Sequence, residues 1–204
     1  LAMYLAHENI SQPFDDSLFI GELALDGSLR HTPGILSLAL FAKAHQIRNV
    51  FVPRVNAKEA TLVNNITVYP VDSFQQLIQH ITNIQPITPL APTPLDPHQH
   101  DADIELDMAY IKGQEFAKRA LEIAASGGHN IIMSGPPGSG KTLLARSFAS
   151  ILPRLTSDEA LEVTKIYSVA GILSAETPLI TDRPFRAPHH SASGVALVGG
   201  GKYP

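Results

Sequence analysis

The sequence predicts an α/β fold that is organised in two parts. In the first part, short apolar runs typical of buried strands alternate with segments of helical character. In the second part, an apolar run at 129–134 leads into a glycine-rich loop, and a helix-forming run at 143–149 leaves it. A proline-rich stretch at 85–103 separates the two parts, because prolines spaced two or three residues apart prevent both helix and sheet.

Composition and charge are those of a globular protein and exclude several functional classes. The 204 residues, of which 44% are hydrophobic and 17% charged, suffice for one large domain or two small ones. A net charge of −4 gives no overall basic field for nucleic acid or a membrane surface. The absence of cysteine excludes disulfides, thiolate catalysis and cysteine zinc sites, and no apolar run is long enough to span a bilayer. We therefore expect a cytoplasmic protein without membrane contact.

The strands of the first part are predicted from apolar runs that end at proline, glycine or a turn. They lie at residues 18–25, 49–53 and 67–71. Asp26-Gly27, directly after the first run, is a dipeptide typical of turns.

The helices of the first part are predicted from their start signals. Pro33 suits the first turn of a helix at 34–45, since its missing N–H has no partner there in any case. Two further helices are expected at capping boxes, in which two side chains three residues apart bond each other's backbone amides. These pairs are Asn56 with Glu59 and Ser73 with Gln76, the second opening a helix through Ile81.

The second part is predicted to contain helices on both sides of the glycine-rich loop. A helix at 113–126 has apolar residues at helical spacing, including Phe116 and Leu121, and Gly127-Gly128 ends it. The run at 129–134 is the expected strand, and Pro153 stops the helix that follows the loop. A further helix through 163 begins at Thr156 or Ser157, and residues 177–204 give no firm secondary structure.

The loop itself fits the phosphate-binding pattern G-x-x-x-x-G-K-[ST]. It reads Gly135-Pro136-Pro137-Gly138-Ser139-Gly140-Lys141-Thr142. Glycines let backbone amides approach crowded phosphate oxygens, Lys141 reaches the β- and γ-phosphates, and the Thr142 hydroxyl ligates Mg²⁺. The alternative is an ordinary glycine-rich turn, but the predicted strand before it and helix after it favour binding of ATP with Mg²⁺.

Several segments resemble a known family. Ile111-Lys112-Gly113-Gln114, followed by the loop, resembles the start of an AAA+ ATPase module. Three other segments resemble the ComM/YifB family of magnesium-chelatase-like ATPases, and they lie at 161–171, 183–191 and 197–201. The first part resembles that family's N-terminal domain, itself similar to the Lon protease domain, at 21–27, Val52-Pro53 and Asn56-Ala57.

This resemblance implies a domain plan and an activity. Residues 1–84 are expected to be the C-terminal part of a non-catalytic Lon-protease-like domain, 85–104 a linker, and 105–204 the N-terminal part of an AAA+ domain that ends before Walker B. Family members form ATP-driven rings, usually homo-hexamers, and are linked to DNA handling as branch-migrating helicases in natural transformation. Relatives in magnesium chelatase drive metal insertion into a porphyrin. Ile111 and Gln114, with Lys112, are expected to flank the adenine.

No catalytic residue is expected within this chain. ATP hydrolysis needs an acidic pair after a hydrophobic strand. Asp158-Glu159 follows residues 153–157, which do not form such a strand, and is better explained as a helix N-terminus. We expect this piece to bind nucleotide without turning it over. Peptidase activity is not expected either, since Leu36 and Leu38 stand where Lon has its lysine-containing stretch.

The remaining polar clusters leave alternatives open. A linker group of potential metal ligands is expected to be solvated, because closely spaced ligands in a tether rarely hold a fixed geometry. It consists of His98, His100, Asp101 and Asp103. His189-His190, with Arg183 and Arg186, contacts DNA phosphates or a neighbouring subunit, or else forms a structural turn. Two other functions compete with DNA remodelling, namely a chelatase-type motor acting on a protein partner and a non-motor nucleotide-binding regulator.

Overall fold

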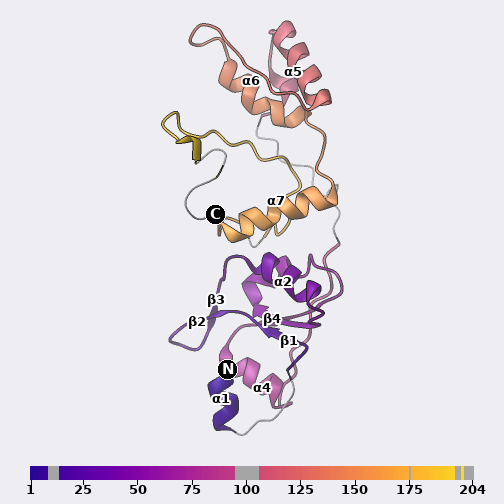
Figure 1. The fold of residues 1–204 in the computed structure, drawn as a ribbon, viewed down its shortest axis with the longest axis vertical. Coiled ribbons are helices and arrows are strands. Elements are labelled where there is room, and N and C mark those ends of the chain that lie inside the picture. The colour runs from indigo at the N-terminus through magenta and orange to yellow at the C-terminus, as the bar shows by residue number, and fades with distance from the viewer. Residues whose placement is uncertain (9–13, 95–105, 175, 196–198, 200–204) are drawn as a thin grey trace. The chain divides into compact units, whose positions relative to one another are not determined.

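The computed structural model describes residues 1–8, 14–94, 106–174, 176–195 and 199 (Figure 1). They form two compact units. The first contains the described residues of 1–100 and of 155–181, and the second contains those of 101–154 and 182–204. The domain division expected from the sequence stays a prediction, but the structure groups residues 155–181 with the first unit.

A parallel sheet forms the centre of the first unit and confirms the predicted α/β fold class. Its order is β1 (Ser17–Phe19), β4 (Asn49–Pro53) and β5 (Thr67–Val71), with β4 in the middle. In register, Leu18 pairs with Val50, and Val50 pairs with Val68. The strands predicted at 49–53 and 67–71 are therefore confirmed.

The strand predicted at 18–25 is divided in two. After β1, the Ile20 amide donates to the Phe51 carbonyl at 2.9 Å, and then the chain leaves the sheet. It forms a separate antiparallel pair of β2 (Glu22–Leu23) and β3 (Leu29–Arg30). The turn between them contains Asp26 and Gly27, as predicted, and Gly27 has a left-handed φ of 84°.

Helices pack against this sheet through a core of small and branched side chains. In α2 (Ile35–Ala44), four fully buried residues follow helical spacing, namely Ile35, Leu36, Ala39 and Ala42. The helix begins two residues after Pro33, because Gly34 at its N-cap has a left-handed φ of 80°. The other helical segments before residue 95 are α1 (Ala2–His7), η1 (Arg54–Asn56), α3 (Ala57–Ala60) and α4 (Phe74–Ile81).

The two capping boxes predicted in the first part differ in outcome. Ser73 caps α4 as expected, its hydroxyl accepting from the Gln76 amide at 3.2 Å, although Gln76 Oε1 accepts from Asp72 rather than from Ser73. The box at Asn56 and Glu59 is wrong. Both side chains are buried and serve distant segments, so the polar groups expected to cap a helix locally instead connect separate parts of the unit.

The first residues of the proline-rich stretch are attached to the first unit. Leu90 forms an antiparallel bridge with Val68, and its amide donates to the Val68 carbonyl at 2.9 Å. The Thr93 amide donates to the Thr61 carbonyl at 3.1 Å, and Ile87 is buried. The predicted linker residues 95–104 lie outside the described residues.

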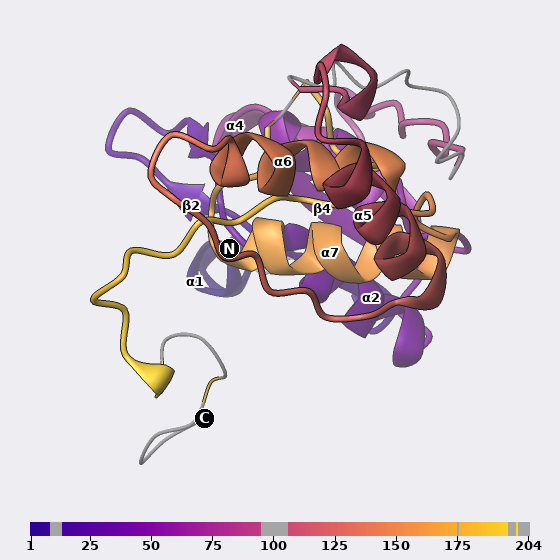
Figure 2. The same ribbon diagram turned by 90° about the horizontal axis from the view of Figure 1, so that it is seen from above.

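Helix α7 (Ser157–Val169) belongs to the first unit and lies beside α2 (Figures 1 and 2). Thr156 is its cap, in a capping box in which Glu159 Oε2 accepts from the Thr156 amide at 2.8 Å. The acidic pair at 158–159 thus lies at a helix N-terminus, as predicted. The helix continues beyond the predicted end at 163, because its buried positions, Ala160, Thr164 and Ser168, recur at every fourth residue.

The second unit has a small core between helices on either side of the loop. Its elements are η2 (Met108–Tyr110), α5 (Glu115–Gly127), α6 (Lys141–Ser147) and η3 (Phe148–Ile151). The buried residues of this core are Met108, Ile111, Leu121 and Leu144. Across the described residues, no helix combines the length and the apolar character needed to cross a bilayer.

The strand predicted at 129–134 does not form. Residues 130–134 make no backbone hydrogen bond to another described residue, and Ile132 is 94% exposed. A strand needs a hydrogen-bonded neighbour, and none of the described strands lies in this unit. The segment leads into the loop without a sheet around it.

Three aromatic rings stack across the sheet of the first unit, and a histidine ring packs against two of them. Phe51 stacks on Phe19 at a centroid distance of 4.7 Å and on Tyr69 at 4.6 Å. The His80 ring lies 5.3 Å from both Phe51 and Tyr69, and its Nδ1 accepts from the Ile87 amide at 3.0 Å. Burial lowers the pKa of His80 below its ordinary value, so the folded state favours the neutral ring.

This arrangement predicts a pH-dependent contribution to stability. The contribution of His80 to the free energy of unfolding is fully present above its ordinary pKa of 6.5. It is lost as the pH falls through and below that value, because the unfolded chain binds a proton at His80 more readily than the folded chain does. We expect the urea midpoint of His80→Gln to fall less between pH 8 and pH 5.5 than that of the wild type. His7→Gln, at an exposed histidine, is the control and should keep the wild-type slope.

Candidate phosphate-binding site

The loop at 135–142 has the backbone shape that requires glycine at two positions. Gly138 and Gly140 have left-handed φ values of 77° and 85°, and no atom lies within 4 Å of the place where a Cβ would stand on either. Backbone conformation, rather than crowding, therefore demands glycine here. At Gly135 the constraint is different, because a Cβ would lie 3.3 Å from Ser139 Oγ, inside the closed loop.

The Lys141 side chain turns back into the loop and closes it. Its Nζ donates to the carbonyl oxygens of Gly135 at 2.9 Å and Pro136 at 2.8 Å, and to Ser139 Oγ at 3.2 Å. These three bonds use all the donors of an ammonium group. Every acceptor is neutral, and Lys141 forms no ion pair with another described residue. A positive charge thus stands at the centre of the loop without a carboxylate to neutralise it.

Thr142 follows in the first turn of α6, and its side chain is exposed. Pro136, Pro137 and Gly138 are exposed as well, whereas Ser139 and Gly140 are half-buried. The structure thus brings the predicted loop residues together around one ammonium group, and it leaves a hydroxyl accessible beside that group. A hydroxyl oxygen is a suitable ligand for a hard cation such as Mg²⁺.

Helix α6 is fixed to the unit by its buried side. Leu144 is 3% exposed and belongs to the core with Met108 and Leu121. Ser147 is fully buried, and its hydroxyl donates to the Leu144 carbonyl at 3.0 Å. The helix that begins at Lys141 is therefore held in place from its second turn, which positions the end of the loop.

The residues expected to flank an adenine have different surroundings. Ile111 is 7% exposed and lies in the core with Leu144. Gln114 is exposed at the N-cap of α5, with a left-handed φ of 59°. Their contact with a base stays a prediction.

Phe116, one of the apolar residues at helical spacing in α5, is exposed. Its ring is 92% exposed, while Leu121, Ala124 and Ala125 are buried. Phe116 lies five residues before Leu121, and at about 3.6 residues per turn that spacing leaves the buried face. The sequence spacing from Leu121 therefore indicates the exposure of Phe116.

Of the other polar clusters, the histidine pair makes local contacts and the linker group lies outside the described residues. His189 Nδ1 is 2.7 Å from Ser191 Oγ, and the exposed rings of His189 and His190 lie 4.1 Å apart, so their proposed contact with DNA or a subunit stays a prediction. The potential ligands at 98, 100, 101 and 103 lie outside the described residues. Within the described ranges, no three or more His, Cys, Asp or Glu residues gather into a potential metal site.

Two family models match the sequence. Residues 107–204 match the model described as magnesium chelatase, subunit ChlI, and residues 1–56 match the model described as subunit ChlI of Mg-chelatase. The first match includes the loop and both helices around it.

Longer proteins of several bacteria are similar to most or all of the chain. An uncharacterized protein of Mycobacterium tuberculosis is 44% identical over 92% of this chain and 36% of its own length. The uncharacterized protein YifB of Escherichia coli is 38% identical over 100% of this chain and 39% of its own. Competence protein ComM of Haemophilus influenzae is 40% identical over 91% of this chain and 36% of its own. The chain thus spans 36 to 39% of the length of these relatives.

The loop geometry predicts that replacing Gly140 lowers both folding stability and nucleotide affinity. Gly140→Ala forces a side chain into a left-handed conformation and should cost about 1 kcal/mol of folding stability. It should also weaken nucleotide binding, because the loop amides lose their arrangement. The matched control is Gly27→Ala, which imposes the same strain at a φ of 84° in the first unit. Urea unfolding and titration with a fluorescent ATP analogue measure both effects; equal affinity of Gly140→Ala and wild type would contradict this role of the loop.

Proposed function

The chain belongs to the ComM/YifB family of magnesium-chelatase-like proteins, and from this premise we propose that residues 135–142 bind the triphosphate of ATP. The full-length protein is then an AAA+ ATPase subunit, which assembles as a homo-hexamer in the cytoplasm. In this proposal the site consists of the eight loop residues Gly135 to Thr142, with Ile111 and Gln114 near the base.

The uncompensated charge of Lys141 is the observation that carries this proposal. Its ammonium group is already at the centre of the loop and is bonded to the neutral carbonyls of Gly135 and Pro136. Phosphate oxygens are better partners, because they carry the negative charge that the carbonyls lack and so add Coulomb attraction to the hydrogen bond. The β- and γ-phosphates would therefore replace these carbonyls at Lys141, while amides near Gly138 and Gly140 approach the other oxygens.

Thr142 is the residue of this chain that would hold Mg²⁺ beside the phosphates. Its exposed hydroxyl follows Lys141 directly, and a single neutral oxygen suits an ion that takes its other ligands from phosphates and water. Bound Mg²⁺ would neutralise phosphate charge. In this proposal Lys141 orients the phosphates and Thr142 holds the ion.

Turnover requires an acidic pair after a hydrophobic strand, and none of the described strands lies in the unit that contains the loop. The carboxylate of Glu159 accepts from the Thr156 amide, and the pair at 158–159 belongs to the first unit. We therefore assign ATP hydrolysis to the full-length protein and only nucleotide binding to this chain. The energy of hydrolysis would drive a motor.

DNA remodelling or branch migration is the leading proposal for that motor, and it is supported by a relative named competence protein ComM. The second candidate is a motor acting on a protein partner without DNA contact, favoured by the two family models of a magnesium chelatase subunit. Binding of branched DNA by the full-length protein separates them. DNA binding should weaken steeply with salt, as counterion release requires, whereas no binding at low salt would favour the protein partner.

Lys141→Ala should abolish ATP binding without unfolding the chain, because the side chain is bonded only to its own loop and Leu144 holds the helix. Lys118→Ala, at a lysine of α5 that pairs with Glu115, is the matched control and should bind as the wild type does. Titration with a fluorescent ATP analogue measures both. Unchanged affinity of Lys141→Ala would refute the assigned role.

Mg-ATP should also stabilise the unit that carries the loop. At about 100 times Kd the expected gain is about 2.7 kcal/mol, because the ligand binds only the folded state. A thermal shift with Mg-ATP, present in Lys118→Ala and absent in Lys141→Ala, would be the expected pattern. A shift of equal size in Lys141→Ala would show that ATP binds elsewhere.

A further inference from the structure

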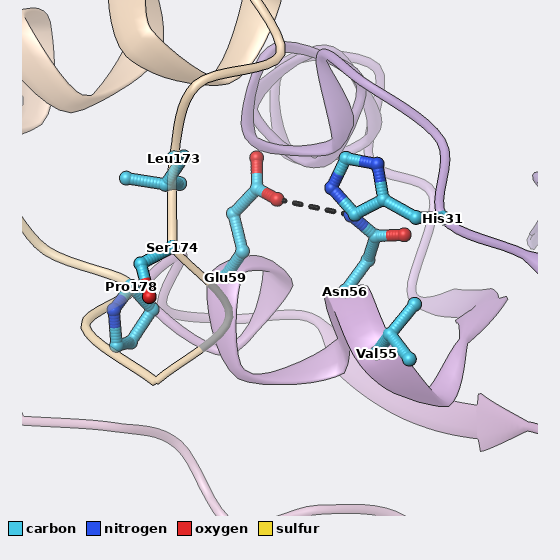
Figure 3. Close-up of a pocket in the computed structure, with 7 residues that line it drawn as sticks. All are labelled: His31, Val55, Asn56, Glu59, Leu173, Ser174 and Pro178. Carbon is cyan, nitrogen blue, oxygen red and sulfur yellow. Dashed lines mark hydrogen bonds between the residues drawn. The ribbon is translucent and has the colours of Figure 1, made fainter.

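A small polar pocket opens on the first unit, and all of its lining residues belong to that unit. Figure 3 shows the pocket between α3 and the chain that follows α7. Its cavity volume is about 10 Å³, which is room for the centre of about one water-sized group. The pocket therefore suits a single small head group and is too small for a whole sugar or nucleotide.

A buried carboxylate lies at the base of this pocket. Glu59 is 6% exposed, and its Oε1 accepts from the Leu36 amide at 2.8 Å and from the Ser168 hydroxyl. Its Oε2 accepts from Asn56 Nδ2 at 3.3 Å, and Figure 3 shows this oxygen directed to Asn56, which also lines the pocket. A carboxylate oxygen has room for a further, shorter bond.

No positive charge among the described residues balances Glu59. None of the ion pairs in the described part of the chain includes it, so its charge depends on neutral donors. A buried charge without a counter-charge is costly, and a cation that reaches it removes part of that cost. The base of the pocket therefore selects a group that carries a positive charge.

Two further acceptors line the same pocket nearer to solvent. The exposed ring of His31 forms no hydrogen bond or ion pair with another described residue, and a neutral imidazole has one accepting nitrogen. Ser174 is exposed, and its Oγ accepts from the Glu176 amide at 3.2 Å and keeps a second lone pair. With Glu59, these side chains offer three acceptors around one small space. A primary ammonium group has three N–H donors.

The rest of the lining is mainly apolar and favours an ammonium group on an alkyl chain. Val55, which is 50% exposed, lines the pocket together with Leu173 and Pro178. An alkyl stem that leads from the ammonium group to solvent would pack along these side chains, as lysine stems do on protein surfaces. A bare metal ion is less suited, because no three or more His, Cys, Asp or Glu residues gather within the described ranges.

We propose that this pocket binds a primary alkylammonium group. Glu59 supplies the opposite charge, and His31 and Ser174 accept the remaining N–H groups. A free alkylamine and the side chain of a lysine in a partner protein present the same chemistry. The proposal concerns the first unit alone and does not depend on nucleotide binding at the loop.

Calorimetric titration of the full-length protein, without nucleotide and at pH 8, tests this directly. The probes are n-butylammonium and tetramethylammonium, which carry the same charge, although only the first has N–H donors. We expect n-butylammonium to bind about tenfold more tightly or better, because a hydrogen bond to a charged group contributes that much. Equal affinity for the two ions, or no binding of n-butylammonium, would overturn the proposal.

A third probe, Nα-acetyl-lysine methylamide, distinguishes the two sources of the ammonium group. Binding at least as tight as that of n-butylammonium indicates a lysine side chain. Exclusion of this probe, with n-butylammonium still bound, indicates a free amine.

Variants locate the binding at the pocket. Glu59→Gln removes the charge while keeping the size of the side chain, and Ser174→Ala and His31→Ala each remove one acceptor at an exposed position. Each should weaken n-butylammonium binding by about tenfold or more. Glu162→Gln removes a carboxylate from an exposed position of α7 and is the matched control, with wild-type affinity expected.

The exposed variants keep the test decisive if Glu59→Gln fails to fold. Wild-type affinity of a folded Glu59→Gln, or of both Ser174→Ala and His31→Ala, would show that the ion binds elsewhere and would overturn the proposal.

Discussion

One ammonium group closes the loop between 135 and 141, and the functional account depends on it. Lys141 is bonded to two carbonyl oxygens and one hydroxyl of its own loop, and none of these partners carries a negative charge. Two left-handed glycines allow the backbone to reach that ammonium group. The neutral oxygens around Lys141 solvate its ammonium group but do not neutralise its charge. A polyanion at this position would therefore gain Coulomb attraction.

The first unit is organised by a charge of opposite sign. Glu59 lies among fully buried apolar residues of α2 and α3, and two of its three donors, Leu36 and Ser168, are distant in the sequence. Asn56 extends this network to Thr32, through bonds to both its amide and its carbonyl. Because each donor must be in place for the carboxylate to remain buried, the network makes the position of α7 depend on the rest of the unit.

Much of the local structure could be predicted from the sequence, and the predictions that failed depend on contacts between distant parts of the chain. The cap at Thr156 and the residues that form the loop were predictable, since each depends on neighbours along the chain. The strands at 49–53 and 67–71 were predictable because both apolar runs lie in the same unit and pair with each other. The capping box at Asn56 and Glu59 failed because the same side chains satisfy distant groups. The strand at 129–134 failed because a strand is defined by its partner. Nothing local in residues 157–169 indicates that they pack in the first unit, since this depends on contacts with distant residues, among them α2 and Glu59.

A structure of the protein with Mg²⁺ and a non-hydrolysable ATP analogue tests the central claim most directly. The distances from Lys141 Nζ to the carbonyl oxygens of Gly135 and Pro136 are the quantity to measure, and they start at 2.9 Å and 2.8 Å. We predict that at least one of these bonds is lost and that Nζ lies within hydrogen-bonding distance of the β- or γ-phosphate. An analogue bound away from the loop, with Lys141 still bonded to both carbonyls, would contradict it.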